Sequence, residues 1–179
     1  MSVSGEVVLG IDPGTAVTGY GVVRRDPRGV PQLIECGVIR TKADQPLARR
    51  LRDIHDGVHE LITRHQPHTL AVESVFYARN VRTTVVLGHA RGVILLAGEQ
   101  AGLRIAEYPP AEIKKAITGR GAATKEQVQY MVAQLLRLKT PPQPADAADG
   151  VAAALCALLS ASLPSLSDST PPSLLRRRG

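Results

Sequence analysis

The sequence predicts an α/β layered domain built on a mixed five-stranded sheet with helices on both faces. Three strand-like segments follow one another at the start of the chain, and helical and strand-like segments alternate after them. Consecutive strands favour antiparallel pairing, whereas strands separated by helices favour parallel pairing. A chain of 179 residues is long enough to bury one hydrophobic core. We therefore expect one folded domain at residues 1–162.

The first three strands are predicted to form an antiparallel meander. EVVLGID (6–12) is a short apolar run that ends at Pro13-Gly14. TGYGVVRR (18–25) and PQLIECGVIR (31–40) follow, separated by the turn-like DPRG (26–29). Short apolar runs bounded by Gly, Pro and Asp are typical of strands joined by tight turns.

A helix, a strand, a long helix and a further strand are expected next. The first helix follows Pro46, a residue suited to a first turn, and its apolar residues recur at helical spacing: Leu47, Leu51, Ile54, Val58, Leu61 and Ile62. HTLAVE (68–73) and LRIAEY (103–108) are short strand-like runs on either side of a helical segment at 80–101. These two runs complete the five strands.

Two more helices are predicted before the composition of the chain changes at residue 163. One begins after Thr124, which forms a capping-box pattern with Gln127. The other runs from about Pro144 to about Ser162. Residues 163–179 are rich in Ser and Pro and end in three arginines. This composition predicts a disordered basic tail.

Composition limits the classes of partner and compartment. The net charge of +6 and the pI near 9.7 indicate a polyanionic partner, although many basic proteins bind no nucleic acid. No apolar run approaches the roughly 18 residues of a membrane span. The N-terminus lacks the basic flank and cleavage site of a signal peptide. Cys36 and Cys156 lie in apolar patterns and are read as free thiols in a reducing compartment, so we expect a cytoplasmic protein.

Two carboxylates end predicted strands. Asp12 follows the first apolar run, and Glu73 completes the buried-looking LAVE. In α/β sheets, ligands bind at the carboxyl ends of the strands. An aspartate that prepares an Asp-Pro-Gly reversal accounts for Asp12 equally well. A strand that emerges into solvent would account for Glu73.

Two further carboxylates, Asp146 and Asp149, lie three residues apart at the start of the last helix and therefore share a face. Acidic residues are also favoured in a first helical turn without any catalytic role. The same face continues through the small residues Gly150 and Ala153, which predicts that the helix is covered on both sides. If all four acids converge, their oxygens suit Mg²⁺ or Mn²⁺, and without metal they would repel one another.

Five segments together resemble a known family. GIDPGTAVTGYGVV, AVESVFYARN, LGHARGV, ITGRGAATKEQVQ and ADAADGVAAAL occur in this order between residues 10 and 155. In this combination the chain resembles the RuvC family of bacterial Holliday-junction resolvases, which belongs to the RNase H-like nuclease superfamily. The resemblance covers roughly residues 6–160.

The resemblance implies a homodimer that cuts four-way DNA junctions by symmetric nicks on two strands of like polarity. It assigns the catalytic and metal-binding roles to Asp12, Glu73, Asp146 and Asp149, with Asp149 in the most variable position. Two Mg²⁺ ions, for which Mn²⁺ is a plausible substitute, would lie about 3.5–4 Å apart in such a site. A branch-migration helicase complex is implied as a partner in recombination and repair.

Candidate DNA contacts follow Glu73 and surround a glycine-rich turn. Phe76, Tyr77 and Arg79 follow Glu73, and an aromatic ring there could stack on an unpaired base, worth about 1–3 kcal/mol. A core position accounts for a lone phenylalanine without any DNA. The basic residues near ITGRGAATK suit phosphates or a solvated surface: Lys114, Lys115, Arg120 and Lys125. The resemblance favours DNA roles for Phe76, Lys114 and Lys125.

Gly88 and Gly92 lie four residues apart in the long predicted helix. A stripe of small residues allows close helix approach, either in a dimer or against the helix's own sheet. The resemblance favours the dimer, and a two-fold axis would place two active sites symmetrically.

Three other functions fit parts of the sequence. DPGT (12–15) matches the phosphate loop of actin and sugar-kinase phosphotransferases, but this chain offers no second glycine-rich phosphate loop, and we expect no ATP binding. A junction-binding module without catalysis would not need four acids. A related RNase H-like nuclease that acts on RNA or on stalled transcription complexes would need the same acids, so only substrate competition separates it.

Overall fold

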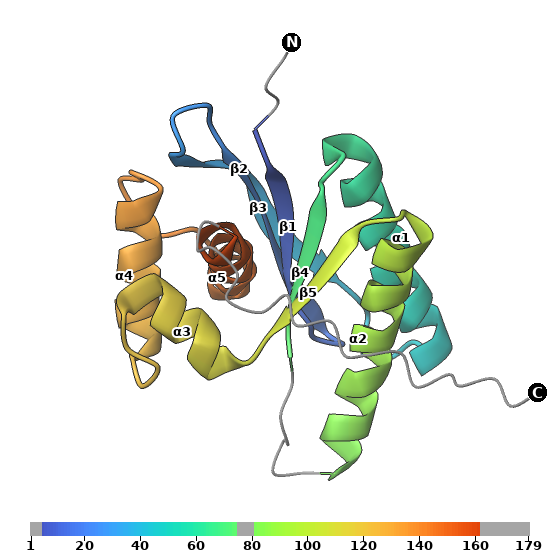
Figure 1. Ribbon diagram of the computed structural model, residues 1–179. Coiled ribbons are helices and arrows are strands. Elements are labelled where there is room, and N and C mark those ends of the chain that lie inside the picture. The colour runs from blue at the N-terminus through green and yellow to red at the C-terminus, as the bar shows by residue number, and fades with distance from the viewer. Residues whose placement is uncertain (1–4, 75–80, 162–179) are drawn as a thin grey trace, which may run out of the picture.

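The structure, a computed structural model, describes residues 5–74 and 81–161 and contains a five-stranded sheet flanked by five helices (Figure 1). The strands are β1 (Val7–Asp12), β2 (Val17–Arg25), β3 (Pro31–Arg40), β4 (Thr69–Glu73) and β5 (Arg104–Tyr108). The helices are α1 (Leu47–His65), α2 (Val81–Gln100), α3 (Pro110–Thr118), α4 (Lys125–Leu135) and α5 (Ala145–Ser160). The predicted tail at 163–179 lies outside the described residues.

The sheet has the predicted mixed topology, with strand order β3-β2-β1-β4-β5. β2 pairs antiparallel with both β1 and β3, whereas β4 is parallel to β1 and β5 is parallel to β4. The capping box predicted at Thr124 is present, with reciprocal hydrogen bonds to Gln127. Helix α3 was not predicted from the sequence, which only placed Lys114 and Lys115 near a glycine-rich turn. The last helix also ends slightly earlier than expected, at Ser160.

Helices cover both faces of the sheet and create two apolar cores (Figure 1). On one face, α1 and α2 contribute buried residues such as Ile54 and Ile94 to a core with Leu9 and Leu70. On the other face, α5 lies directly against β1 and β2, and α3 and α4 pack on its outer side. No helix within 5–74 or 81–161 combines the length and apolar character needed to cross a membrane.

The approach of α5 to the sheet is unusually close because glycine and alanine line the contact. A Cβ atom added to Gly10 of β1 would lie 2.2 Å from the Gly150 carbonyl oxygen and 2.3 Å from the Ala154 nitrogen. A Cβ atom added to Gly19 of β2 would lie 1.8 Å from the carbonyl oxygen of Asp146. Backbone therefore meets backbone across this layer, which explains the alanine-rich sequence of α5. It also brings the first turn of α5 to the end of β1.

Gly10→Ala is expected to lower the free energy of unfolding by about 1–3 kcal/mol, because the new methyl group meets helix backbone that cannot rotate away. Equilibrium urea unfolding measures the change. The same substitution at Gly88 is the control, measured at protein concentrations that keep the chain monomeric, because no described residue outside its own helix lies within 4 Å of an added Cβ there. Gly88→Ala should be neutral or stabilise by up to about 1 kcal/mol through helix propensity. Equal effects of the two substitutions would contradict this account of the α5 contact.

Candidate active site

Asp12 and Glu73 come from neighbouring parallel strands that end at the same edge of the sheet. β1 and β4 pair through Ile11 and Val72, and each acid is the next residue and the last of its strand. Both side chains are half-buried. The sheet register therefore sets the spacing between these two carboxylates.

The start of α5 adds Asp146 and Asp149 to this edge. Both lie in the first five residues of the helix, and the contact of the Asp146 backbone with Gly19 holds that turn against β2. One carboxylate oxygen from each of Asp12, Asp146 and Asp149 can be chosen so that all three lie within 4.8 Å of one another. Three of the four predicted acids thus form a cluster of potential metal ligands.

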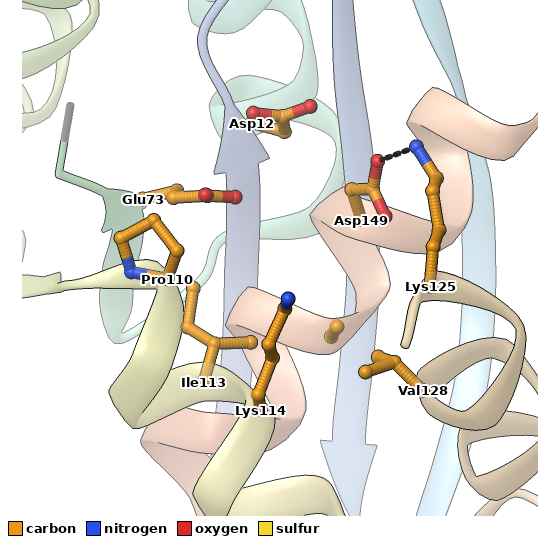
Figure 2. Close-up of a pocket in the computed structure, with 9 residues that line it drawn as sticks. Asp12, Glu73, Pro110, Ile113, Lys114, Lys125, Val128 and Asp149 are labelled. Carbon is orange, nitrogen blue, oxygen red and sulfur yellow. Dashed lines mark hydrogen bonds and ion pairs between the residues drawn. The ribbon is translucent and has the colours of Figure 1, made fainter. Parts of the chain in front are cut away.

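Glu73 faces the same pocket from the other side (Figure 2). The pocket is lined by Asp12, Glu73 and Asp149, and by Lys114 and Lys125, whose side chains extend towards the acids in Figure 2. Glu73 is not one of the three residues of the compact cluster. The structure therefore brings Glu73 into the pocket, across from Asp149 in Figure 2, and its charge acts on Asp12.

Burial and mutual repulsion perturb the acids. Burial, followed by the charges of Glu73, Asp149 and Asp146, raises the pKa of Asp12 from 3.8 to about 8. Burial and the charge of Asp149 also raise the pKa of Glu73. Such shifts are typical of functional sites, where like charges are concentrated away from water. Added positive charge at this position would relieve the repulsion.

Lys125 supplies part of that charge. Its Nζ donates a hydrogen bond to Asp149 Oδ2 at 2.6 Å, and this bond raises the pKa of Lys125. The lysine is the first residue of α4, so the capping box at Thr124 fixes the start of the helix that carries it. Lys114, on α3, lowers the pKa of Glu73 by its charge but less than burial raises it. Both lysines thus act electrostatically on the acids.

Of the other predicted DNA contacts, the two that the structure describes, Lys115 and Arg120, do not line this pocket. Lys115 lies on α3 beside Lys114 but lines a separate hollow with Ala111 and Gly121. Arg120 lines another hollow between the end of α3 and the outer face of α4. Phe76, Tyr77 and Arg79 lie outside the described residues. Contact of these five residues with DNA stays a prediction.

The apolar wall of the pocket was not anticipated from the sequence. Pro110 and Ile113 of α3, Val128 of α4 and Ala152 of α5 complete the lining. The signal for α3 was present, because Pro110 stands at the first helical position and Ile113 and Ile117 repeat at a spacing of four. With α3 recognised, the pairing of Lys114 with Ile113 at the pocket could have been anticipated.

The donor set fits a hard divalent cation. Every acidic ligand candidate offers carboxylate oxygen, the donor that Mg²⁺ and Mn²⁺ prefer. The raised pKa of Asp12 is a second sign that the cluster lacks compensating charge. Asp12, Asp146 and Asp149, with Glu73 opposite, are therefore suited to hold metal.

This sheet order, with acids at the carboxyl edge, defines an α/β protein of the RNase H-like class. A family model described as "Crossover junction endodeoxyribonuclease RuvC" matches residues 8–157. The chain therefore belongs to the RuvC family.

Curated relatives and solved structures agree with this membership. A RuvC of Halorhodospira halophila is 54% identical over 149 residues, which is 83% of this chain and 87% of the relative. A RuvC of Desulforamulus reducens is 46% identical over 151 residues, 84% of this chain and 91% of the relative. Thermus thermophilus RuvC in complex with Holliday junction substrate has a TM-score of 0.79 at 34% identity, covering 87% of this chain and 94% of that chain. The RNase H-like fold expected from the resemblance is thereby confirmed.

Proposed function

We propose that this protein is a structure-specific endodeoxyribonuclease that resolves four-way DNA junctions during recombination and repair. It would cut two strands of like polarity by symmetric nicks. The observation that carries the proposal is the acidic cluster at the carboxyl edge of the sheet, in a chain of the RuvC family. Curated relatives are named crossover junction endodeoxyribonucleases, and the solved Thermus relative is complexed with a Holliday junction.

The chemistry proposed for the site is hydrolysis of a phosphodiester dependent on Mg²⁺. Two bound divalent ions would activate water and neutralise charge on the attacking and leaving oxygens. Asp12, Glu73, Asp146 and Asp149 would hold these ions and keep them at the sheet edge. Lys114 and Lys125 would attract the scissile phosphate, because their ammonium groups line the same pocket.

The direct experiment is cleavage of a synthetic four-way junction with Mg²⁺, in competition with a linear duplex, an RNA–DNA hybrid and single-stranded RNA. A junction resolvase should nick the junction at symmetric positions and leave the competitors intact. Preferential cutting of the hybrid or the RNA would instead support a related nuclease with another substrate. ATP binding by the wild-type chain would favour the phosphotransferase alternative.

A homodimer is the assembly we propose, through the exposed face of α2. Five residues spaced by three or four along this helix are exposed and form a stripe of apolar and small side chains: Val81, Val85, Gly88, Gly92 and Leu96. Among residues 5–74 and 81–161, no atom outside the helix backbone itself lies within 4 Å of a Cβ added at Gly88 or Gly92, so these glycines do not serve packing on their own sheet. Partnership with a branch-migration helicase complex is proposed from the family resemblance alone.

Val85→Glu is expected to convert the dimer into a folded monomer, because it places a charge on an apolar stripe that the dimer would bury. Analytical ultracentrifugation measures the assembly, and circular dichroism checks the fold. Ile34→Glu is the matched control, because Ile34 is similarly exposed but lies on β3. A wild-type monomer, or a dimer unaffected by Val85→Glu, would contradict the proposed interface.

A further inference from the structure

The turn that follows Asp12 is held by side chains from outside the acidic site. Residues 13–16 connect Asp12 to β2. The carbonyl oxygen of Thr15 accepts hydrogen bonds from Thr41 Oγ1 at 2.5 Å and from Arg50 Nη2 at 2.7 Å. These two side chains also bind each other, because Arg50 Nε donates to Thr41 Oγ1 at 2.9 Å. The residue after β3 and the first turns of α1 therefore meet at one carbonyl group of this turn.

The neighbouring carbonyl groups of the turn are also bonded. The Gly14 oxygen accepts from Thr18 Oγ1 at 2.6 Å, and Thr18 is fully buried. The Ala16 oxygen accepts from the backbone N–H of Thr41 at 3.1 Å. Three successive carbonyl groups thus have defined partners, which leaves the backbone after Asp12 little freedom to move.

The partners of Arg50 differ from those of its neighbours on α1. Arg49 and Arg52 are exposed and form ion pairs with acids four residues further along the helix. Arg50 is half-buried and, among the described residues, forms no ion pair; its guanidinium binds the turn instead. A planar guanidinium can hold two acceptors in a fixed relation, which suits a clamp between two segments.

We infer that Arg50 and Thr41 are positioning residues for the active site, acting through the turn at 13–16 to hold Asp12. Asp12 is joined directly to this turn, and its carboxylate must keep its place beside Asp146 and Asp149 for the three to share a metal ion. A displacement of about 1 Å at such a site can cost about a hundredfold in rate. The inference rests on the proposed function for its catalytic consequence, but its effect on metal binding does not depend on the substrate.

The test compares Arg50→Met, Arg50→Lys and Thr41→Val with the control Arg49→Met in the full-length protein. Mn²⁺ binding, followed by electron paramagnetic resonance, is the primary readout, and urea unfolding reports the folded fraction. Loss of partners that orient metal ligands typically costs about 10–100-fold in affinity, so Arg50→Met should raise the Mn²⁺ Kd by about 10-fold or more. Arg50→Lys should restore part of this loss, and Arg49→Met should match the wild type.

The Mg²⁺ midpoint of junction cleavage should shift with the Mn²⁺ affinity, while junction binding without metal stays unchanged. The effects of Arg50→Met and Thr41→Val should be less than additive in the double variant, because both act on one carbonyl group. Wild-type Mn²⁺ affinity in folded Arg50→Met overturns the inference. Should Arg50→Met not fold, the near-isosteric Thr41→Val decides by the same criterion. Metal binding without junction cleavage by the wild type would reject the proposed function alone.

Discussion

Asp12→Asn is expected to lower the rate of junction cleavage by about a thousandfold or more. The amide keeps the size of the side chain but removes the negative charge at the centre of the acidic cluster. The variant should bind the metal ions more weakly and so lose several kcal/mol of charge stabilisation in the transition state. Each 1.4 kcal/mol lost lowers the rate about tenfold. Single-turnover cleavage at saturating Mg²⁺ measures the loss.

Junction binding should survive the same substitution. Without metal the Asp12 carboxyl group, with its pKa raised to about 8, is mostly protonated at neutral pH, so an amide in its place should not weaken the attraction of phosphates to Lys114 and Lys125. A mobility-shift titration without divalent metal should therefore give a Kd within about threefold of the wild type, a tolerance of roughly 0.7 kcal/mol. Asp56→Asn, at an exposed acid of α1, is the control and should retain full cleavage. Undiminished cutting by Asp12→Asn would reject the proposed mechanism.

The strand-end acids were predictable because strand direction decides where they meet. Once 6–12 and 68–73 are recognised as neighbouring parallel strands, Asp12 and Glu73 must lie at the same edge of the sheet, whatever the conformation of the loops. The helix acids needed a further observation, the small residues after Asp149. The structure supplies the physical reason, since those residues allow α5 to contact the sheet backbone directly. Apolar pattern and residue size therefore carried most of the fold and made a cluster of acids reasonable, whereas the assignment of all four acids to one site came from the family resemblance.

The different positions of Lys114 and Lys115 could not be predicted from the sequence pattern. With α3 unrecognised, the residue pattern alone gave no reason to separate Lys114 from Lys115, and only the family resemblance favoured Lys114. In a helix, Lys114 lies about 100° and Lys115 about 200° around the axis from Ile113, so Lys114 can share the pocket with Ile113 whereas Lys115 faces away from it. The clamp by Arg50 and Thr41 was unpredictable for a different reason. It joins positions 26 and 35 residues away from Thr15 through single side-chain contacts, which leave no periodic pattern.

Metal-free Asp12→Asn is expected to be more stable than the wild type, with the largest gain near pH 8. The pKa of Asp12 is raised from 3.8 to about 8 in the fold, so the folded state holds a proton that the unfolded chain releases above pH 4. Stability of the wild type should therefore fall as pH rises from about 4 to about 8. Since one pKa unit corresponds to about 1.4 kcal/mol, the gain at pH 8 should be at least ~2 kcal/mol and should vanish near pH 4.

Saturating Mg²⁺ should reverse the order of stability, because metal binds the folded wild type and offsets the repulsion among its carboxylates. A ligand at a hundred times its Kd adds about 2.7 kcal/mol to the free energy of unfolding. Asp149→Asn is the informative comparison, because it removes an acid that is already paired with Lys125 and should stabilise the metal-free protein less. Urea unfolding in chelator and in Mg²⁺, at pH 4, 6 and 8, measures all three proteins. If the metal-free wild type has a higher free energy of unfolding than Asp12→Asn at pH 8, the charges of the acids are already compensated within the fold. The argument that the acids need a metal ion to balance their charge would then be wrong.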